Sequence, residues 1–159
     1  GELAEEMYGV AGEHKNRLHI EGIDSFIEKE VIEERYLERN WLAGIALFPP
    51  TEHYKKKELT KFFEYMNAGL PVICSDFPVW KAFVERYECG IAVDPEDDEA
   101  IKEAIDYLRN NPEEASRMGR NGKKAVMEEL NWQTQEYKLI RWYNGLLNKE
   151  LSSGTGEEL

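Results

Sequence analysis

The stretch HYKKKELTKFFEYMNAGLPVICSD, residues 53–76, combines a lysine-rich segment, a helix and a buried strand. KFFEYMNAG is typical of a helix that ends at Gly69, because glycine readily adopts the left-handed backbone of a helix end. PVICSD is short, apolar and rich in β-branched residues, as expected of a strand buried in a parallel sheet. A helix followed at once by such a strand is the repeating unit of α/β folds.

Strands and helices alternate on both sides of this stretch. Strands are predicted at residues 17–20, 44–48, 71–76 and 90–95. Helices are predicted at residues 24–40, 61–69, 79–87, 99–111, 112–130 and 132–147. This order predicts a parallel α/β sheet with right-handed connections, formed by one domain at 1–150, and the Gly/Ser-rich residues 151–159 are predicted to be a disordered tail. Asp97 or Asp98 can cap the helix at 99–111.

The composition is that of a globular domain and limits the classes of function. Of the 159 residues 42% are hydrophobic, and 32 acidic against 20 basic residues give a net charge of −12. This charge argues against binding nucleic acid or an anionic membrane as the main role. No apolar run reaches the ~20 residues of a membrane span. Cys74 and Cys89 show no metal-ligand spacing with each other or with a histidine, and two thiols in such a domain indicate a reducing, cytoplasmic location.

Four lysines crowd between residues 55 and 61, where the chain leaves strand 44–48 and enters the next helix. Ligands of open α/β sheets bind beyond the carboxyl ends of the strands, and helix N-termini attract anions. The segment is therefore a candidate phosphate or diphosphate site. Glu64, about one turn into the helix, can accept hydrogen bonds from a ribose diol. The alternative is that the lysines are a solvated surface and that Glu64 only compensates the helix dipole.

KFFEYMNAGLPVICSD resembles the signature of the retaining glycosyltransferases with the GT-B fold, the large glycosyl transferases group 1 family. ERNWLAGIALFPP and the run from CGIAVDPEDDE to MGRNGKKAVMEELNW resemble further family motifs in the same order, so the resemblance spans residues 17–147. It implies the C-terminal, nucleotide-sugar-binding domain, with a Rossmann-like parallel sheet and flanking helices. It also implies that the first two strands of that domain and the N-terminal, acceptor-binding domain are missing, because Gly1 aligns after the second strand.

The resemblance implies a nucleotide-binding set that comprises Gly22, Ile23, Leu59, Thr60, Lys61 and Glu64. In this set Glu64 would bind the ribose hydroxyls of the donor, and the backbone amides of Leu59 and Thr60 its diphosphate. Lys61 stands where related members often carry a lysine, and Gly22 and Ile23 follow the strand that lies near the nucleotide base. One position departs from the family pattern: Lys56 stands where the family has its first glutamate, whose carboxylate would face the reacting sugar.

The function implied for the parent protein is transfer of a sugar from a nucleoside diphosphate sugar to an acceptor, with retention and without metal or cofactor. The chain alone is expected to be inactive. An alternative from another class, favoured by Lys56, is a non-catalytic binding or assembly module that kept the fold. A sugar-nucleotide epimerase is a third reading, which EYMNAG fits less well. The edge that strand 44–48 would leave unmatched predicts self-association, and the other expected partners are the donor and the missing acceptor domain.

Overall fold

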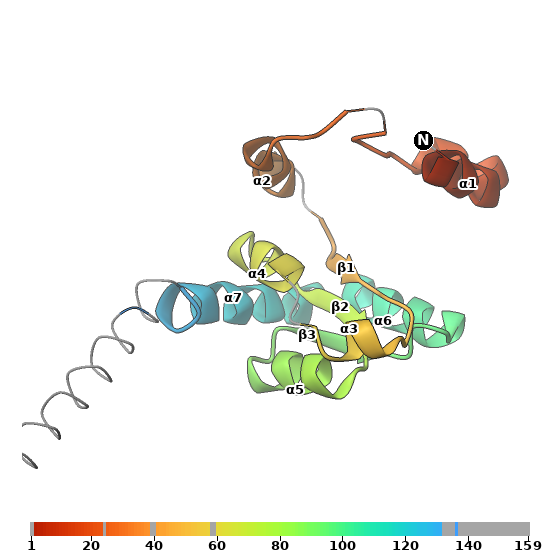
Figure 1. Ribbon diagram of the computed structural model, residues 1–159. Helices are drawn as coiled ribbons and strands as arrows, with labels where there is room; N and C mark the ends of the chain where they lie inside the picture. Colours follow the sequence, from red (N-terminus) through yellow and green to blue (C-terminus); the bar gives the residue numbers. More distant parts are fainter. Residues whose placement is uncertain (1, 24, 39–40, 58–59, 132–135, 137–159) are drawn as a thin grey trace, which may run out of the picture. The chain divides into compact units, whose positions relative to one another are not determined.

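The computed structural model describes residues 2–23, 25–38, 41–57, 60–131 and 136, and the chain divides into two compact units, residues 1–40 and 41–159. The first unit contains α1 (Glu2–Ala11), the 3-10 helix η1 (Gly12–Arg17) and α2 (Lys29–Glu38). The second contains β1 (Gly44–Ala46), α3 (Glu52–Lys55), α4 (Thr60–Asn67), β2 (Val72–Ser75), α5 (Pro78–Arg86), β3 (Gly90–Val93), α6 (Asp98–Asn110) and α7 (Pro112–Glu128) (Figure 1).

The first unit consists of helices that bury little apolar surface. Among its described side chains only Ala4 is buried. Apolar side chains such as Phe26 and Leu37 are largely exposed. The helix predicted at 24–40 is confirmed by α2, although α2 begins later, at Lys29. This unit therefore has no hydrophobic core of its own within the described residues.

The strand predicted at residues 17–20 is wrong. Arg17 is the last residue of η1, and the residues after it are irregular. Glu21 pairs with the side chains of His19 and Arg35 at 2.9 and 3.1 Å, and the hydrogen bond from His19 together with the charge of Arg35 lowers the pKa of the Glu21 carboxyl. A strand needs a neighbouring strand to pair its backbone groups, and the described part of this unit contains none.

The second unit is built on a three-stranded parallel sheet in the order β1-β2-β3. In its register Gly44 lies opposite Val72, and Val72 lies opposite Gly90. The three strands confirm the predictions at residues 44–48, 71–76 and 90–95. The predicted Rossmann-like α/β fold is thus confirmed, with each observed strand shorter than its predicted span.

Both faces of the central strand β2 are covered by other elements. Its four residues are all buried, and the first three, Val72 to Cys74, are apolar as expected of a strand covered on both faces. Val72 and Cys74 pack into a core with α4 and α5, whereas Ile73 packs into a second core with α6, because side chains alternate across a strand. The predicted helices at 61–69, 79–87, 99–111 and 112–130 are confirmed by α4, α5, α6 and α7.

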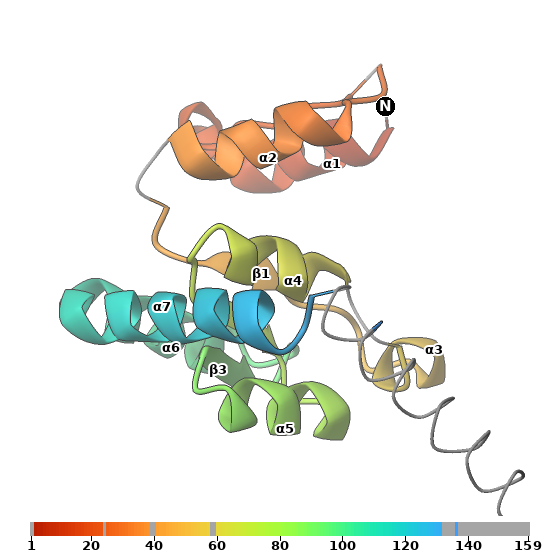
Figure 2. The same cartoon turned by 90° about the vertical axis from the view of Figure 1, so that its left-hand side faces the viewer.

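Helix α7 runs alongside α4, and the motif MGRNG allows this close approach (Figure 2). A Cβ atom on Gly119 would lie 2.0 Å from the carbonyl oxygen of Gly69, just past the end of α4. One on Gly122 would lie 3.0 Å from the side chain of Met66. Both glycines are buried, so the spacing of this motif is explained by helix packing.

Cys74 and Cys89 are free thiols buried in the core beside α4 and α5. Burial raises the pKa of Cys74 to about 12 and the pKa of Cys89 to about 11. Both are therefore apolar fillers of the core. The tail predicted at 151–159 lies outside the described residues, as does the helix predicted at 132–147 apart from residue 136. The predicted single domain at 1–150 stays a prediction.

Candidate functional site

The candidate site lies where the chain leaves β1 and enters α4. Two prolines, Pro49 and Pro50, follow β1 and end the strand, because proline cannot donate to a sheet ladder. The hydroxyl of Thr51 then accepts a hydrogen bond from the N–H of Tyr54 and caps the short α3. Helix α4 begins at Thr60, so its N-terminus follows the carboxyl end of β1, as the sequence predicts.

Ser75 fixes the chain that leaves β1. Its buried hydroxyl accepts a hydrogen bond from the N–H of Phe48 at 2.9 Å and donates one to the Phe48 carbonyl at 3.1 Å. The ends of β1 and β2 are thereby joined beyond their ladder. The sequence analysis missed this role, and its only signal is a serine at the end of the apolar run VICS.

Trp80 joins the segment before α4 to α5. Its indole N–H donates a hydrogen bond to the carbonyl of Lys57 at 2.7 Å. The ring is 1% exposed and has ring neighbours at centroid distances of 5.8 Å, 5.5 Å and 4.8 Å, namely Phe48, Phe62 and Phe77. Trp80 is therefore a core residue whose indole N–H also has an acceptor, and no sequence pattern points to that hydrogen bond.

Three of the four lysines of this segment are paired with carboxylates. Lys61 lies 2.8 Å from Glu64 on the first turns of α4, and the two side chains are 43% and 26% exposed. Lys55 and Lys56 lie 3.4 and 3.5 Å from Glu52. Such exposed pairs contribute little to stability, so an incoming anion can replace the carboxylates at small cost.

The structure brings three of the predicted residues together on the first turns of α4. Thr60 is its exposed first residue, and Lys61 and Glu64 follow as an ion pair. Leu59 lies outside the described residues. Gly22, with a φ of 77°, and Ile23 belong to the first unit, so their role at the nucleotide base stays a prediction.

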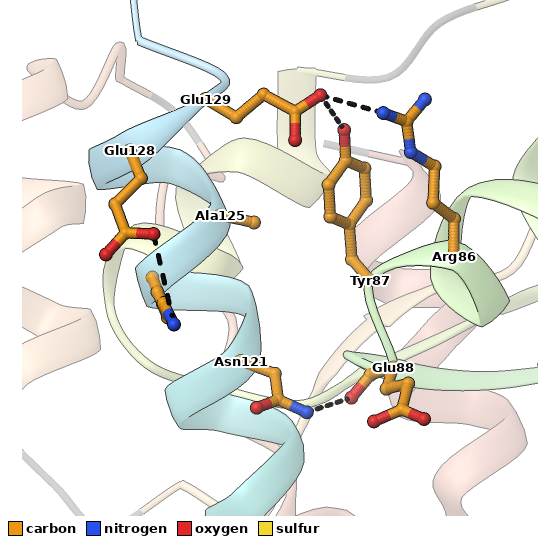
Figure 3. A pocket seen from close by; sticks show the side chains of 8 residues that line it. Arg86, Tyr87, Glu88, Asn121, Ala125, Glu128 and Glu129 are labelled. Carbon is orange, nitrogen blue, oxygen red and sulfur yellow. Dashed lines mark hydrogen bonds and ion pairs between the residues drawn. The ribbon is translucent and has the colours of Figure 1, made fainter.

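Two pockets of the described residues lie elsewhere. One, of about 290 Å³, lies between the end of α5 and α7 (Figure 3). There Glu129 accepts hydrogen bonds from Arg86 at 2.8 Å and from the Tyr87 hydroxyl at 3.0 Å, and Asn121 donates to the carbonyl of Glu88 at 3.2 Å. The polar groups of this pocket are hydrogen-bonded to one another. These bonds hold the turn after α5, in which Glu88 has a φ of 45°.

The second pocket, of about 390 Å³, is lined by Pro112, Glu113, Ser116 and Arg120 at the start of α7. Neither pocket contains a residue of the predicted nucleotide-binding set. Within the described residues no three His, Cys, Asp or Glu side chains are grouped as metal ligands would be. No helix of the described residues is long and apolar enough to cross a membrane.

Part of the chain that begins at this site matches the model of a known protein family. Residues 60–125, from the first residue of α4 into α7, match the model of the family described as Glycosyl transferases group 1. No curated protein matches the chain significantly.

The fold is similar to that of a solved sucrose-phosphate synthase from Thermosynechococcus elongatus, with a TM-score of 0.68 and 24% sequence identity. The match covers 94% of this chain and 35% of that one, so the chain spans about a third of the synthase. Residues 60–125 are thus similar to the glycosyl transferases group 1 family, and the sheet and helices around them have a Rossmann-like fold like that of the synthase.

Proposed function

We propose that the chain is the donor-binding part of a glycosyltransferase that takes a sugar from a nucleoside diphosphate sugar and transfers it with retention of configuration. The observation that carries this proposal is the Lys61–Glu64 pair at the start of α4, beyond the carboxyl end of β1. The pair lies within the segment that matches the family. It offers a cation and a carboxylate side by side, which suits a ligand that has both phosphates and a diol.

The N-terminus of α4 receives the diphosphate. The first N–H groups of a helix have no acceptor within the helix, and the helix dipole adds partial positive charge. Lys56 and Lys61 supply full charges nearby. In the structure the ammonium group of Lys61 lies 2.8 Å from the Glu64 carboxylate. When the donor binds, Lys61 turns to a phosphate oxygen and Glu64 accepts the ribose hydroxyls, so that neither side chain is left unpaired.

The chemistry rests on positioning the donor and on stabilising the charge of the departing diphosphate. The residues of the described site supply donors and cations for that charge and need no metal for it. The acceptor would be bound by the part of the parent protein that this chain does not contain, because the chain spans 35% of the similar synthase. The chain alone is therefore expected not to turn over.

A second candidate function is a binding or assembly module without catalysis. It is favoured by Lys56, whose exposed ammonium group pairs with Glu52 at 3.5 Å where the family would have a carboxylate at the reacting sugar. Both functions predict nucleotide binding. They differ in whether the full-length protein transfers or hydrolyses the sugar, and radiolabelled donor sugars measure this directly.

Calorimetric titration of the chain with UDP, GDP, ADP and their sugars tests donor binding. Glu64→Ala should weaken the tightest of these by about 1–3 kcal/mol, because it removes hydrogen bonds to a charged group. Glu99→Ala is the matched control: Glu99 is also paired with a lysine on the first turn of a helix, at 3.1 Å from Lys102 of α6. Equal affinity in the two variants would remove the role of Glu64, and a chain that binds none of these ligands would refute the proposal.

A further inference from the structure

The chain just after α3, at Lys57, is held by a side chain from another element. The carbonyl of Lys57 accepts a hydrogen bond from the indole N–H of Trp80 at 2.7 Å. Trp80 belongs to the first turn of α5, far along the chain from Lys57. This contact is distinct from the ion pairs of the lysines, since it fixes the backbone and not a side chain.

The indole ring cannot turn away from this carbonyl. Its plane lies at 84° to the ring of Phe48, which follows β1, and at 75° to the ring of Phe62 on α4. Phe77, just before α5, packs against it at a centroid distance of 4.8 Å. A buried indole N–H needs an acceptor, so the ring selects one orientation of the Lys57 peptide group.

Trp80 thereby links the lysine-rich segment to α4. It holds the segment through the Lys57 carbonyl and the helix through the ring of Phe62, which is buried on α4. The relative placement of the lysines and of the α4 N-terminus follows from these two contacts. We propose that Trp80 is a positioning residue for diphosphate binding at α4, an inference that rests on the proposed function.

Replacement of the indole N–H tests this role in the full 159-residue chain. Trp80→Phe removes the donor and some volume, whereas 3-benzothienylalanine at position 80 replaces the N–H by sulfur and keeps the shape of the ring. Both variants should bind UDP, GDP or ADP about five- to tenfold more weakly, the effect of one hydrogen bond. Uridine, guanosine and adenosine, which have no phosphate, should bind as before. Trp41→Phe, at a half-exposed tryptophan, is the control and should bind normally.

A spectroscopic measurement separates positioning from a purely structural role. In ¹⁵N-labelled chain, the indole N–H signal that Trp80→Phe removes should shift on addition of UDP, GDP or ADP and stay in place with the matching nucleosides. Normal diphosphate affinity in a folded variant would overturn the positioning role and leave the proposed function standing. A parent chain that binds no diphosphate would refute both. If both variants fail to fold, the Trp80 signal is assigned as the one that remains in Trp41→Phe, Trp132→Phe and Trp142→Phe, and its failure to move at saturating diphosphate overturns the role.

Discussion

Lys61 is the residue that connects the structure most directly to the proposed function. Its ammonium group lies 2.8 Å from Glu64 and belongs to the first turn of α4. A half-exposed lysine in this place can exchange one anionic partner for another. The same side chain therefore satisfies Glu64 before binding and a phosphate afterwards.

Neutralising the lysines tests this exchange. The double variant Lys56→Gln/Lys61→Gln should bind diphosphate ligands more weakly while nucleoside affinity changes little, because only the phosphates lose cationic partners. The dependence of diphosphate affinity on salt should also become flatter, since less screened attraction remains. Titrations at two ionic strengths measure both effects.

A lysine outside the site provides the control for the double variant. Lys102→Gln removes a lysine that is paired on α6 with Glu99 and Asp106, outside the site, and should leave affinity unchanged. If nucleosides and diphosphates lose affinity alike in the double variant, the lysines are a solvated surface, which is the alternative that the sequence leaves open.

At the scale of elements, helix α6 is capped at its N-terminus by one side chain, that of Asp97. The side chain of Asp97 accepts hydrogen bonds from the N–H groups of Glu99 and Ala100, both at 3.0 Å. Asp97→Ala should lower the free energy of unfolding by about 0.5–2 kcal/mol, the usual value of such a cap. Urea unfolding measures this. Asp98→Ala, one residue into the helix, is the control, and an equal loss in both variants would show that the cap contributes nothing specific.

The sequence predicted the elements whose signal is local. The strands at 44–48, 71–76 and 90–95 are short apolar runs bounded by glycine, proline or aspartate, and each was found. The run at 17–20, RLHI, has only two apolar residues and no described neighbour to pair with, and pairing depends on residues distant in sequence. The four-residue α3 was missed because its start depends on the hydroxyl of Thr51.

The same limit applies to the candidate site. Lys61 and Glu64 were predictable, since their spacing on one helix is fixed by the helix itself. The contacts of Ser75 with Phe48 and of Trp80 with Lys57 join residues more than twenty positions apart. No pattern in a single sequence specifies such partners, so the side chains that hold the site in place became visible only in the structure.

At the scale of the whole molecule, β1 is a sheet edge. Among the described residues it pairs only with β2. The N–H of Gly44 bonds the carbonyl of Pro71 on the β2 side, so the backbone groups of Ile45 face outward. The Tyr65 hydroxyl donates to the Ile45 carbonyl at 3.1 Å, and the Ile45 side chain is 50% exposed. An edge of this kind favours association, and one carbonyl of it is already covered.

Light scattering over a range of concentrations tests self-association. We expect the average mass to rise with concentration, and to rise at lower concentration in Tyr65→Phe, because the Ile45 carbonyl then lacks its donor. Tyr107→Phe, at an exposed tyrosine of α6, should behave as the parent chain. A constant monomer mass in all three proteins would show that the edge of β1 recruits no second copy.

Because Cys74 and Cys89 are buried, the rate at which they react reports how often the core opens. Their pKa values, about 12 for Cys74 and about 11 for Cys89, lie above the ~8.5 of an unfolded thiol, so their contribution to stability is full below about pH 8.5 and is lost as pH rises through 11 to 12. A thiol-modifying dye at pH 8 should therefore colour the folded chain only as fast as it opens. A colour change that is immediate and unaffected by mild denaturant would mean that the core already admits the dye. A gradual colour change would give the rate at which the core opens, measured at cysteines that the chain already has.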